Sequence, residues 1–413
     1  MFCGRWQQNA QLQKDLLMVL WLLVVTIMLY GYGMGTLSLT EPDEVFYAQT
    51  AKEMLARHTW SVPYIFGKPQ FEKPILFYFL LAVGFKFLGI SAAAARLWSC
   101  LFGITGVVLT YYLGKSIYNR RTGFLAALGL ATSFEYLSLS RAVLTDIVLS
   151  TFILGALVSF YFGYLNARKR RFWFLLSFTI CGLATLSKGP IGILLPLLII
   201  FLFLLLRREL NIFFSKEIGW GLILFCFITF PWYLLIYRKF GQLFIDEFFI
   251  RDNIDRFFFV AEHLRNNTWY YYTATTLAGF LPWSAFLVIS LFKIPWRQSI
   301  KEERQKGVLF LICWIAVIFT FFSLAKSKLI SYVFPIFPAL AIFTGNYLDQ
   351  IIQRQEAKDK KSSLSFIIAL GLLAIIFSAG GGYGLYYNQN RRFLPNNLLA
   401  SIPIFCLALP TAI

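Results

Sequence analysis

The sequence predicts an all-α membrane protein with about twelve transmembrane helices, and three observations support this fold class. Of the 413 residues, 58% are hydrophobic and only 14% are charged, with a mean hydropathy of +0.67, whereas an ordinary soluble domain has roughly 25% charged residues. Apolar runs of roughly 20 residues, the length that a helix needs to cross the hydrocarbon, recur through the chain. Because these runs are continuous rather than alternating, they favour helices over a β-barrel.

Each predicted span is one apolar run. The spans are placed at 16–37, 94–117, 122–141, 144–166, 172–187, 190–206, 217–237, 274–292, 308–325, 327–347, 363–386 and 397–413. The run ILFYFLLAVGFKFLGI at 75–90 is short and contains Lys86, so we expect it to lie in the interface. No small-residue cleavage site follows the N-terminal run, which predicts a retained first span rather than a signal peptide.

The charge distribution predicts how these spans are oriented. The formal net charge is +18, and most Lys and Arg residues stand in short gaps between apolar runs, which indicates membrane topology rather than nucleic-acid binding. With 75–90 in the interface, the basic gaps share the N-terminal side; they lie at 120–121, 168–171, 207–208, 293–306 and 354–361. The positive-inside rule then predicts a cytoplasmic N-terminus and extracytoplasmic loops at 38–93 and 238–273, within a single membrane domain over 1–413.

Three carboxylates open the first outer loop, in the string Glu41-Pro42-Asp43-Glu44. Pro42 ends the first span and Asp43 can cap the next helix, so helix capping explains this acid about as well as a function does. The functional interpretation is a general base at the membrane surface, which would deprotonate an acceptor hydroxyl.

Two further charged residues fall on the same predicted face. Lys73, in Phe71-Glu72-Lys73-Pro74, is either an interfacial anchor or a fixed positive charge for a phosphate leaving group. Asp146 opens the fourth span, where the helix dipole already favours a carboxylate. Because two acids and a lysine share one face of the bundle, we predict a polar site there.

Several strings, in the same order over most of residues 38–347, resemble a known family. They are PDEVFYAQTAKEML, HTWSVPYIFGKPQFEKP, AARL, LSRAVLTD at 139–146, LSKGPIGILLP at 186–196, GFLPWS at 279–284, and FFSLAKSKLISYVFPIFPALAI at 321–342. The chain resembles the aminoarabinose transferases that act on lipid A and, more widely, the dolichyl-phosphate-mannose protein mannosyltransferase-like enzymes. These enzymes have the type C glycosyltransferase fold.

The resemblance implies roles for the charged residues of the outer face. Asp43 matches the catalytic aspartate of the family, the base that activates the acceptor hydroxyl, and Glu44 matches its acidic neighbour, which helps to position substrate. Lys73 matches the lysine that contacts the carrier phosphate. Asp146 matches the second acid near the cavity.

The resemblance also covers weaker positions. Tyr47 stands where the family has Tyr, but Phe46 replaces the Arg that usually precedes it, which puts an aminoarabinose substrate in doubt. Glu72 and His263 fall where related enzymes place an acid and a histidine, in one case able to hold a metal. Because a tetrahedral site needs more ligands than these, no metal site is assigned, and a divalent ion is left open as a cofactor.

Lys326 and Lys328 flank a predicted extracytoplasmic turn. Anchoring at the interface is their ordinary role, and contact with a phosphate is the functional alternative.

The resemblance implies a glycosyltransferase of the bacterial inner (plasma) membrane. It would move a sugar, with inversion, from a polyprenyl-phosphate donor to a lipid or protein acceptor on the extracytoplasmic face. A transporter or flippase of lipid-linked saccharides is the alternative, and it would place charges deep in the spans and broken helices in matched halves. A non-catalytic subunit of a membrane complex is a third class. The sugar, and whether the acceptor is lipid A, protein Ser/Thr or another envelope glycan, stay open.

Overall fold

The computed structural model describes residues 2–39, 41–258, 270–294 and 305–356, with 268, 298 and 302. The spans predicted at 363–386 and 397–413, and His263, lie outside these residues. The described part is almost entirely helical, and its two strands, β1 (Tyr64–Ile65) and β2 (Lys68–Pro69), form one small antiparallel hairpin in which Tyr64 pairs with Pro69. The all-α prediction therefore holds for this part of the chain.

Six segments of the described chain are long and apolar enough to cross a membrane. They correspond to α1 (Phe2–Gly31), α4 (Ala92–Ile117), α7 (Thr145–Leu165), α10 (Lys216–Phe240), α16 (Lys306–Leu324), and the segment Ile330–Arg354, which runs through η5 (Ile330–Tyr332), η6 (Phe334–Ile336) and α17 (Phe337–Glu356). In α17 the regular helix starts ten residues after the predicted position 327, and Pro335 and Pro338 stand next to this start, where proline is favoured.

The other predicted spans in the described part take different forms. Residues 172–187 and 190–206 form α8 (Arg170–Lys188) and α9 (Ile191–Arg207). The run 122–141 breaks at Ser133, which has extended backbone angles, into α5 (Arg120–Thr132) and α6 (Phe134–Ser140). The run 274–292 breaks around Pro282 into α13 (Tyr271–Gly279) and α14 (Ser284–Phe292). Proline removes a backbone hydrogen bond and favours such a break, although α9 and α10 continue through Pro196 and Pro231. Short segments complete the description: η1 (Ala167–Lys169), η2 (Leu210–Ile212), α11 (Gln242–Phe244), the π-helical η3 (Ile245–Asp255) and α12 (Arg256–Phe258).

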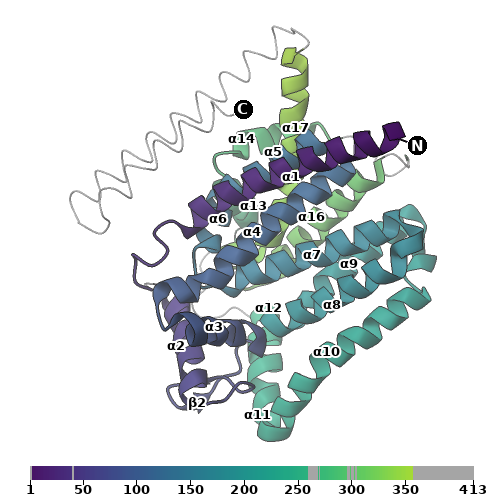
Figure 1. Cartoon of the computed structure of the whole chain (residues 1–413). Helices are drawn as coiled ribbons and strands as arrows, with labels where there is room; N and C mark the ends of the chain where they lie inside the picture. The colour runs from purple at the N-terminus through teal and green to yellow at the C-terminus, as the bar shows by residue number, and fades with distance from the viewer. Residues whose placement is uncertain are drawn as a thin grey trace.

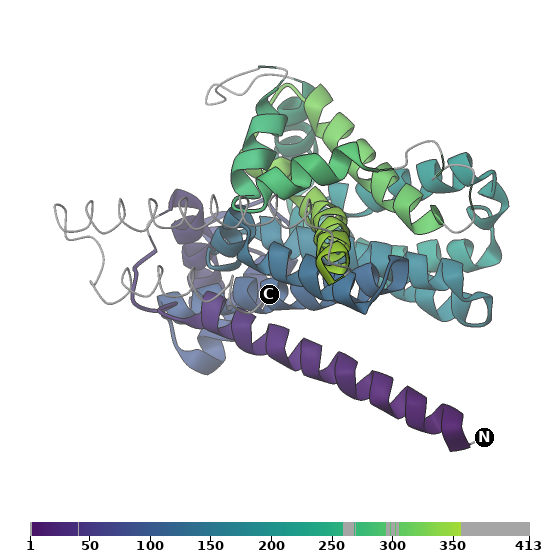
Figure 2. The same cartoon turned by 90° about the horizontal axis from the view of Figure 1, so that it is seen from above.

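The helix α7 forms the centre of the bundle. In the apolar stretch of α7 that is long enough to cross a membrane, 89% of the residues are buried, compared with 17% in α1 and 22% in α10. Figure 2 shows α1 running along the outside of the bundle. Leu16 on α1 and Phe227 on α10 are 59% and 77% exposed, as expected for side chains that face lipid.

One end of the bundle, here named the basic end, is closed by ion pairs. Asp15 of α1 accepts hydrogen bonds from Arg120 (Nε to Oδ1, 2.6 Å) and from Lys115 at the end of α4. Asp349 of α17 accepts from the Asn119 amide at 2.6 Å. Residues distant in sequence therefore meet at one end, and the predicted basic gap at 120–121 lies there.

The opposite end, named the loop end, is built by the first long loop. Figure 1 shows α2 (Pro42–Ala56), the hairpin and α3 (Ile75–Leu88) gathered there. The 14 residues of α3 are fewer than a span needs, and the helix packs against α2 and the start of α4. The helix is thus too short for a span, and its predicted place in the membrane interface stays a prediction.

Candidate active site

A buried ion pair fixes the first loop. Arg96, near the start of α4, donates from Nε and Nη2 to the two carboxylate oxygens of Glu44, both at 3.2 Å. The same guanidinium donates to the backbone carbonyls of Met34 (3.0 Å), Leu37 (2.8 Å) and Ser38 (3.1 Å). Both side chains are less than a tenth exposed. The pair therefore holds the connection between α1 and α2 in a single conformation.

Glu44 also reaches the second acidic segment. Its Oε1 accepts a hydrogen bond from the backbone N–H of Val143 at 2.9 Å. Val143 lies three residues before Asp146, and Glu44 directly follows Asp43. One buried carboxylate thus brings the two predicted acids to the same end of the bundle. Its contacts are those of a residue that holds the site, and its predicted action on substrate stays a prediction.

Three acids lie near enough to the buried phenol of Tyr47 to affect its pKa. Burial raises the pKa of Tyr47, and the negative charges of Asp146, Asp43 and Glu72 raise this pKa further, against the opposing effect of a hydrogen bond with Thr145. Tyr47 packs on Phe77 and Tyr78 with ring centroids 5.4 and 5.7 Å away. The phenol therefore keeps its proton and can act as a hydrogen-bond donor among carboxylates, and the exposed Asp43 remains accessible to solvent.

Asp146 is paired with a lysine that was not predicted as a site residue. Lys188, the last residue of α8, donates from Nζ to Asp146 Oδ1 at 2.7 Å. The same Nζ lies 5.8 Å from the centre of the Tyr332 ring. A sequence signal for Lys188 exists, since a lysine stands before Gly-Pro inside the apolar string LSKGPIGILLP.

Lys73 links the two long loops. Its Nζ donates to Asp252 Oδ2 at 2.8 Å and to the backbone carbonyl of Glu72 at 2.9 Å. The side chains of Lys73 and Asp252 are 11% and 9% exposed, so the ion pair is largely shielded from solvent. Asp252 belongs to η3, in the second predicted outer loop. The Asp252 carboxylate thus binds the Lys73 ammonium, which is predicted to bind a phosphate oxygen. Carboxylate and phosphate oxygens accept the same kind of charge-assisted hydrogen bond from an ammonium group.

The remaining predicted residues divide into two groups. Lys328 is 7% exposed and its Nζ lies 5.9 Å from the centre of the Tyr272 ring, whereas Lys326 is exposed and is tied through its backbone N–H to Phe257 O at 3.0 Å. His263 lies outside the described residues. Among the described residues, no three His, Cys, Asp or Glu side chains are arranged to hold a metal ion.

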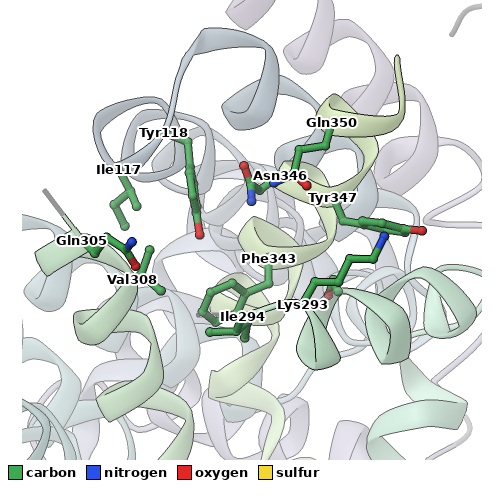
Figure 3. A pocket seen from close by; sticks show the side chains of 11 residues that line it. Ile117, Tyr118, Lys293, Ile294, Gln305, Val308, Phe343, Asn346, Tyr347 and Gln350 are labelled. Carbon is green, nitrogen blue, oxygen red and sulfur yellow. The ribbon is translucent and has the colours of Figure 1, made fainter. Parts of the chain in front are cut away.

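A separate pocket of about 330 Å³ lies at the basic end (Figure 3). Tyr118, Asn346 and Lys293 line it, with Phe343 among its apolar residues. Ile117 and Tyr118 mark the end of α4 opposite Arg96, and a 26-residue helix is about 39 Å long. This pocket therefore lies far from the acids and from Lys73.

An all-helical membrane bundle with acids and a shielded lysine gathered at one end is the arrangement expected of membrane glycosyltransferases with the type C fold, and the comparisons identify the chain as one of them. Residues 16–243 match the family model described as dolichyl-phosphate-mannose-protein mannosyltransferase, which is more than half of the chain. The chain belongs to this family, whose members take sugars from lipid-phosphate donors.

Curated relatives extend the similarity over most of the chain. An uncharacterized protein of Aquifex aeolicus is 30% identical over 395 residues, covering 95% of this chain and 74% of that protein. The undecaprenyl phosphate-α-4-amino-4-deoxy-L-arabinose arabinosyl transferase 1 of Proteus mirabilis is 28% identical over 390 residues, covering 90% and 67%. The corresponding transferase of Erwinia tasmaniensis is 30% identical over 347 residues, and the chain spans 60% of its length.

Solved structures show the same fold. The crystal structure of ArnT from Cupriavidus metallidurans bound to undecaprenyl phosphate has a TM-score of 0.77, with 24% identity over 94% of this chain and 70% of that chain. The oligosaccharyltransferase of Archaeoglobus fulgidus has a TM-score of 0.56 at 12% identity, covering 86% and 54%. The predicted fold class, an all-α polytopic membrane protein, is confirmed.

Proposed function

We propose that this protein transfers a sugar from a polyprenyl-phosphate donor to an acceptor at the loop end of the bundle, which faces outward from a bacterial inner membrane. One observation carries the proposal: the hydrogen bond from Val143 N–H to Glu44 ties the segments that carry Asp43 and Asp146 together, at the end of the bundle where Lys73 is shielded from solvent. The arabinosyl transferases to which the chain is similar are named for an undecaprenyl-phosphate donor.

In this mechanism Lys73 receives the donor phosphate. A phosphate oxygen takes the place of Asp252 Oδ2 on the ammonium, which stabilises the negative charge that builds as the phosphate leaves. The isoprenoid tail of the donor lies along the apolar surface of the bundle. No nucleotide site is required, because the lipid phosphate is the leaving group.

Asp43 acts on the acceptor. It is exposed at the loop end, where an acceptor can approach it. Its carboxylate takes the proton of the acceptor hydroxyl, and the acceptor oxygen forms a bond to the anomeric carbon as the bond from that carbon to the phosphate oxygen breaks. Attack opposite the leaving phosphate inverts the anomeric configuration.

The other polar residues hold this arrangement. Lys188 orients Asp146 through the contact at 2.7 Å, and the pair formed by Glu44 and Arg96 fixes the backbone that carries Asp43. Phe46 stands where aminoarabinose transferases usually have Arg, so the transferred sugar need not be aminoarabinose.

The test is transfer by the purified full-length protein in lipid nanodiscs. The donors are undecaprenyl phosphate carrying radiolabelled 4-amino-4-deoxy-L-arabinose and dolichyl phosphate carrying radiolabelled mannose, with an envelope extract from a deletion strain as acceptor. We expect Asp43→Asn to lower transfer by about 10²- to 10⁴-fold, the usual contribution of a general base, without a loss of thermal stability. Glu217→Gln, which changes an acid in the first turn of α10 instead, is the matched control and should transfer normally.

Other results would contradict this function. Full activity in Asp43→Asn excludes the proposed base. Movement of the labelled donor across a vesicle membrane without a covalent product would indicate a transporter or flippase instead.

A further inference from the structure

Glu135 is a buried acid near the site that no motif predicted. It is 7% exposed, and neither of its carboxylate oxygens has a hydrogen-bond partner in the described part of the chain. It is the second residue of α6, a helix outside the six candidate spans. An acid that is nine-tenths buried without a partner calls for a physical reason.

The surroundings of Glu135 come from α13. The backbone N–H of Phe134 donates to Leu281 O at 2.8 Å, which ties the start of α6 to the connection after α13. A Cβ atom placed on Gly279 would lie 2.1 Å from Glu135 Oε2, so the carboxyl occupies space that only a glycine leaves free. The acid thus rests against the backbone of α13.

The nearby charges do not balance this carboxyl. Burial and then the negative charge of Asp146 on α7 raise the pKa of Glu135 to about 8. Burial and then the charge of Glu135 raise the pKa of Tyr271 on α13. Lys188 is already bound to Asp146. On the other side of α6, α1 and α4 pack against Tyr136, whose hydroxyl donates to Gly103 O at 2.9 Å. Near neutral pH, Glu135 therefore carries its proton.

A buried carboxyl without hydrogen-bond partners, such as that of Glu135, lowers the stability of the fold. A leucine of similar size would fill the space without the cost of burying polar oxygens that lack partners. Polar groups that cost stability in a membrane bundle are typically found where substrates bind. A neutral carboxyl can also both donate and accept a hydrogen bond, which matches a sugar hydroxyl.

We infer that Glu135 is a specificity-determining residue that hydrogen-bonds a hydroxyl of the donor sugar. The inference rests on the proposed function and adds a contact to the sugar itself, apart from the phosphate contact at Lys73. For this contact to form, the Glu135 side chain rotates when the donor binds, so that its carboxyl moves from Gly279 toward Asp146.

Two substitutions separate this role from a structural one. Glu135→Gln keeps a donor and an acceptor in the same shape, and Glu135→Leu keeps the volume alone. With the donors used above, we expect kcat/KM for the donor to fall about tenfold in Glu135→Leu and to change little in Glu135→Gln. Binding of sugar-free undecaprenyl phosphate, measured by displacement of a fluorescent analogue, should be the same in both variants and the wild type.

Thermal stability provides the second readout. Because Glu135 has no protein partner in the described structure, Glu135→Leu should unfold at the same or a higher temperature than the wild type, while losing activity. The matched control is Thr276→Val, which removes another buried hydroxyl without a hydrogen-bond partner from α13 and should transfer normally.

The pH dependence of stability checks the state of the acid. The folded pKa of about 8 exceeds the ordinary value of 4.5, so between these pH values the folded protein holds a proton that the unfolded chain has released. Stability of the wild type should therefore fall relative to Glu135→Gln as the pH rises from about 5 to about 8.

The outcomes are distinct. Three results for Glu135→Leu would overturn this inference but not the proposed function. They are normal transfer, a loss of affinity for sugar-free undecaprenyl phosphate as large as the loss in kcat/KM, and an unfolding temperature below that of the wild type. Movement of the labelled donor across a vesicle membrane by the wild type, without a covalent product, overturns the proposed function, and this inference with it.

Discussion

At the scale of single residues, Glu44 and Asp43 are neighbours in sequence with opposite surroundings. Glu44 is 3% exposed and is held by Arg96 and the Val143 N–H, whereas Asp43 is exposed. The string Asp-Glu predicts two acids at the membrane surface, but it cannot predict which one is buried. That depends on Arg96, which lies 52 residues away in sequence.

This contrast predicts different effects for two conservative substitutions. Glu44→Gln leaves the buried guanidinium of Arg96 without its counter-ion, so we expect it to lower the free energy of unfolding by about 3–5 kcal/mol, with activity lost as the protein unfolds. Asp43→Asn should lose activity at unchanged stability. Unfolding temperatures in detergent measure both, and an equally stable Glu44→Gln protein would contradict the structural role of this pair.

Only some of the other site residues could be predicted from the sequence. Asp146, Tyr47 and Lys73 were predicted, and the structure brings them to one end of the bundle. Lys188 and Glu135 were not, since a single charge inside an apolar run is equally typical of a helix end. Their proximity to Asp146 arises because α6, α7 and α8 meet at the loop end, which is tertiary information.

At the scale of elements, the two long loops are joined at Lys73 and Asp252. The first loop contributes the lysine and η3 contributes the carboxylate, at 2.8 Å. In the proposed mechanism this carboxylate competes with the donor phosphate for one ammonium. Donor binding would therefore release η3 from the first loop.

Substitution of Asp252 tests this competition. Asp252→Asn removes the negative charge that the phosphate must displace, so we expect undecaprenyl phosphate to bind roughly three- to tenfold more tightly. Asp246→Asn, on the same segment but hydrogen-bonded to Gln242 at 2.9 Å, is the control and should bind as the wild type does. Weaker binding by Asp252→Asn would show that the pair supports the donor site instead of blocking it.

Two of the predicted spans are each broken into two helices in the structure. Hydropathy alone predicts 122–141 and 274–292 as continuous helices, and the structure breaks each into two. The break at Pro282 has a sequence signal, whereas Ser133 ends α5 without one. These breaks matter for function, because they place α6 and α13, and so Glu135, at the loop end.

At the scale of the whole molecule, charge separates the two ends of the bundle. Asp15, Lys115, Arg120 and Asp349 close the basic end, and the acids around Tyr47 occupy the loop end. The positive-inside rule then favours a cytoplasmic basic end and an outward site. The positions of most spans could be predicted from apolar runs along the sequence, because only helices and closed barrels satisfy the backbone hydrogen bonds within lipid. The pairing of distant helices could not.

The position of the donor phosphate is the most direct test of this mechanism. Undecaprenyl phosphate with a photoreactive group next to the phosphate would be cross-linked to the purified protein, and the labelled peptides would be identified by mass spectrometry. We expect the label, displaced by excess undecaprenyl phosphate, in the segments that contain Lys73 and Asp252. Specific label confined to the basic-end pocket, at Tyr118, Lys293 or Asn346, would contradict the proposed site.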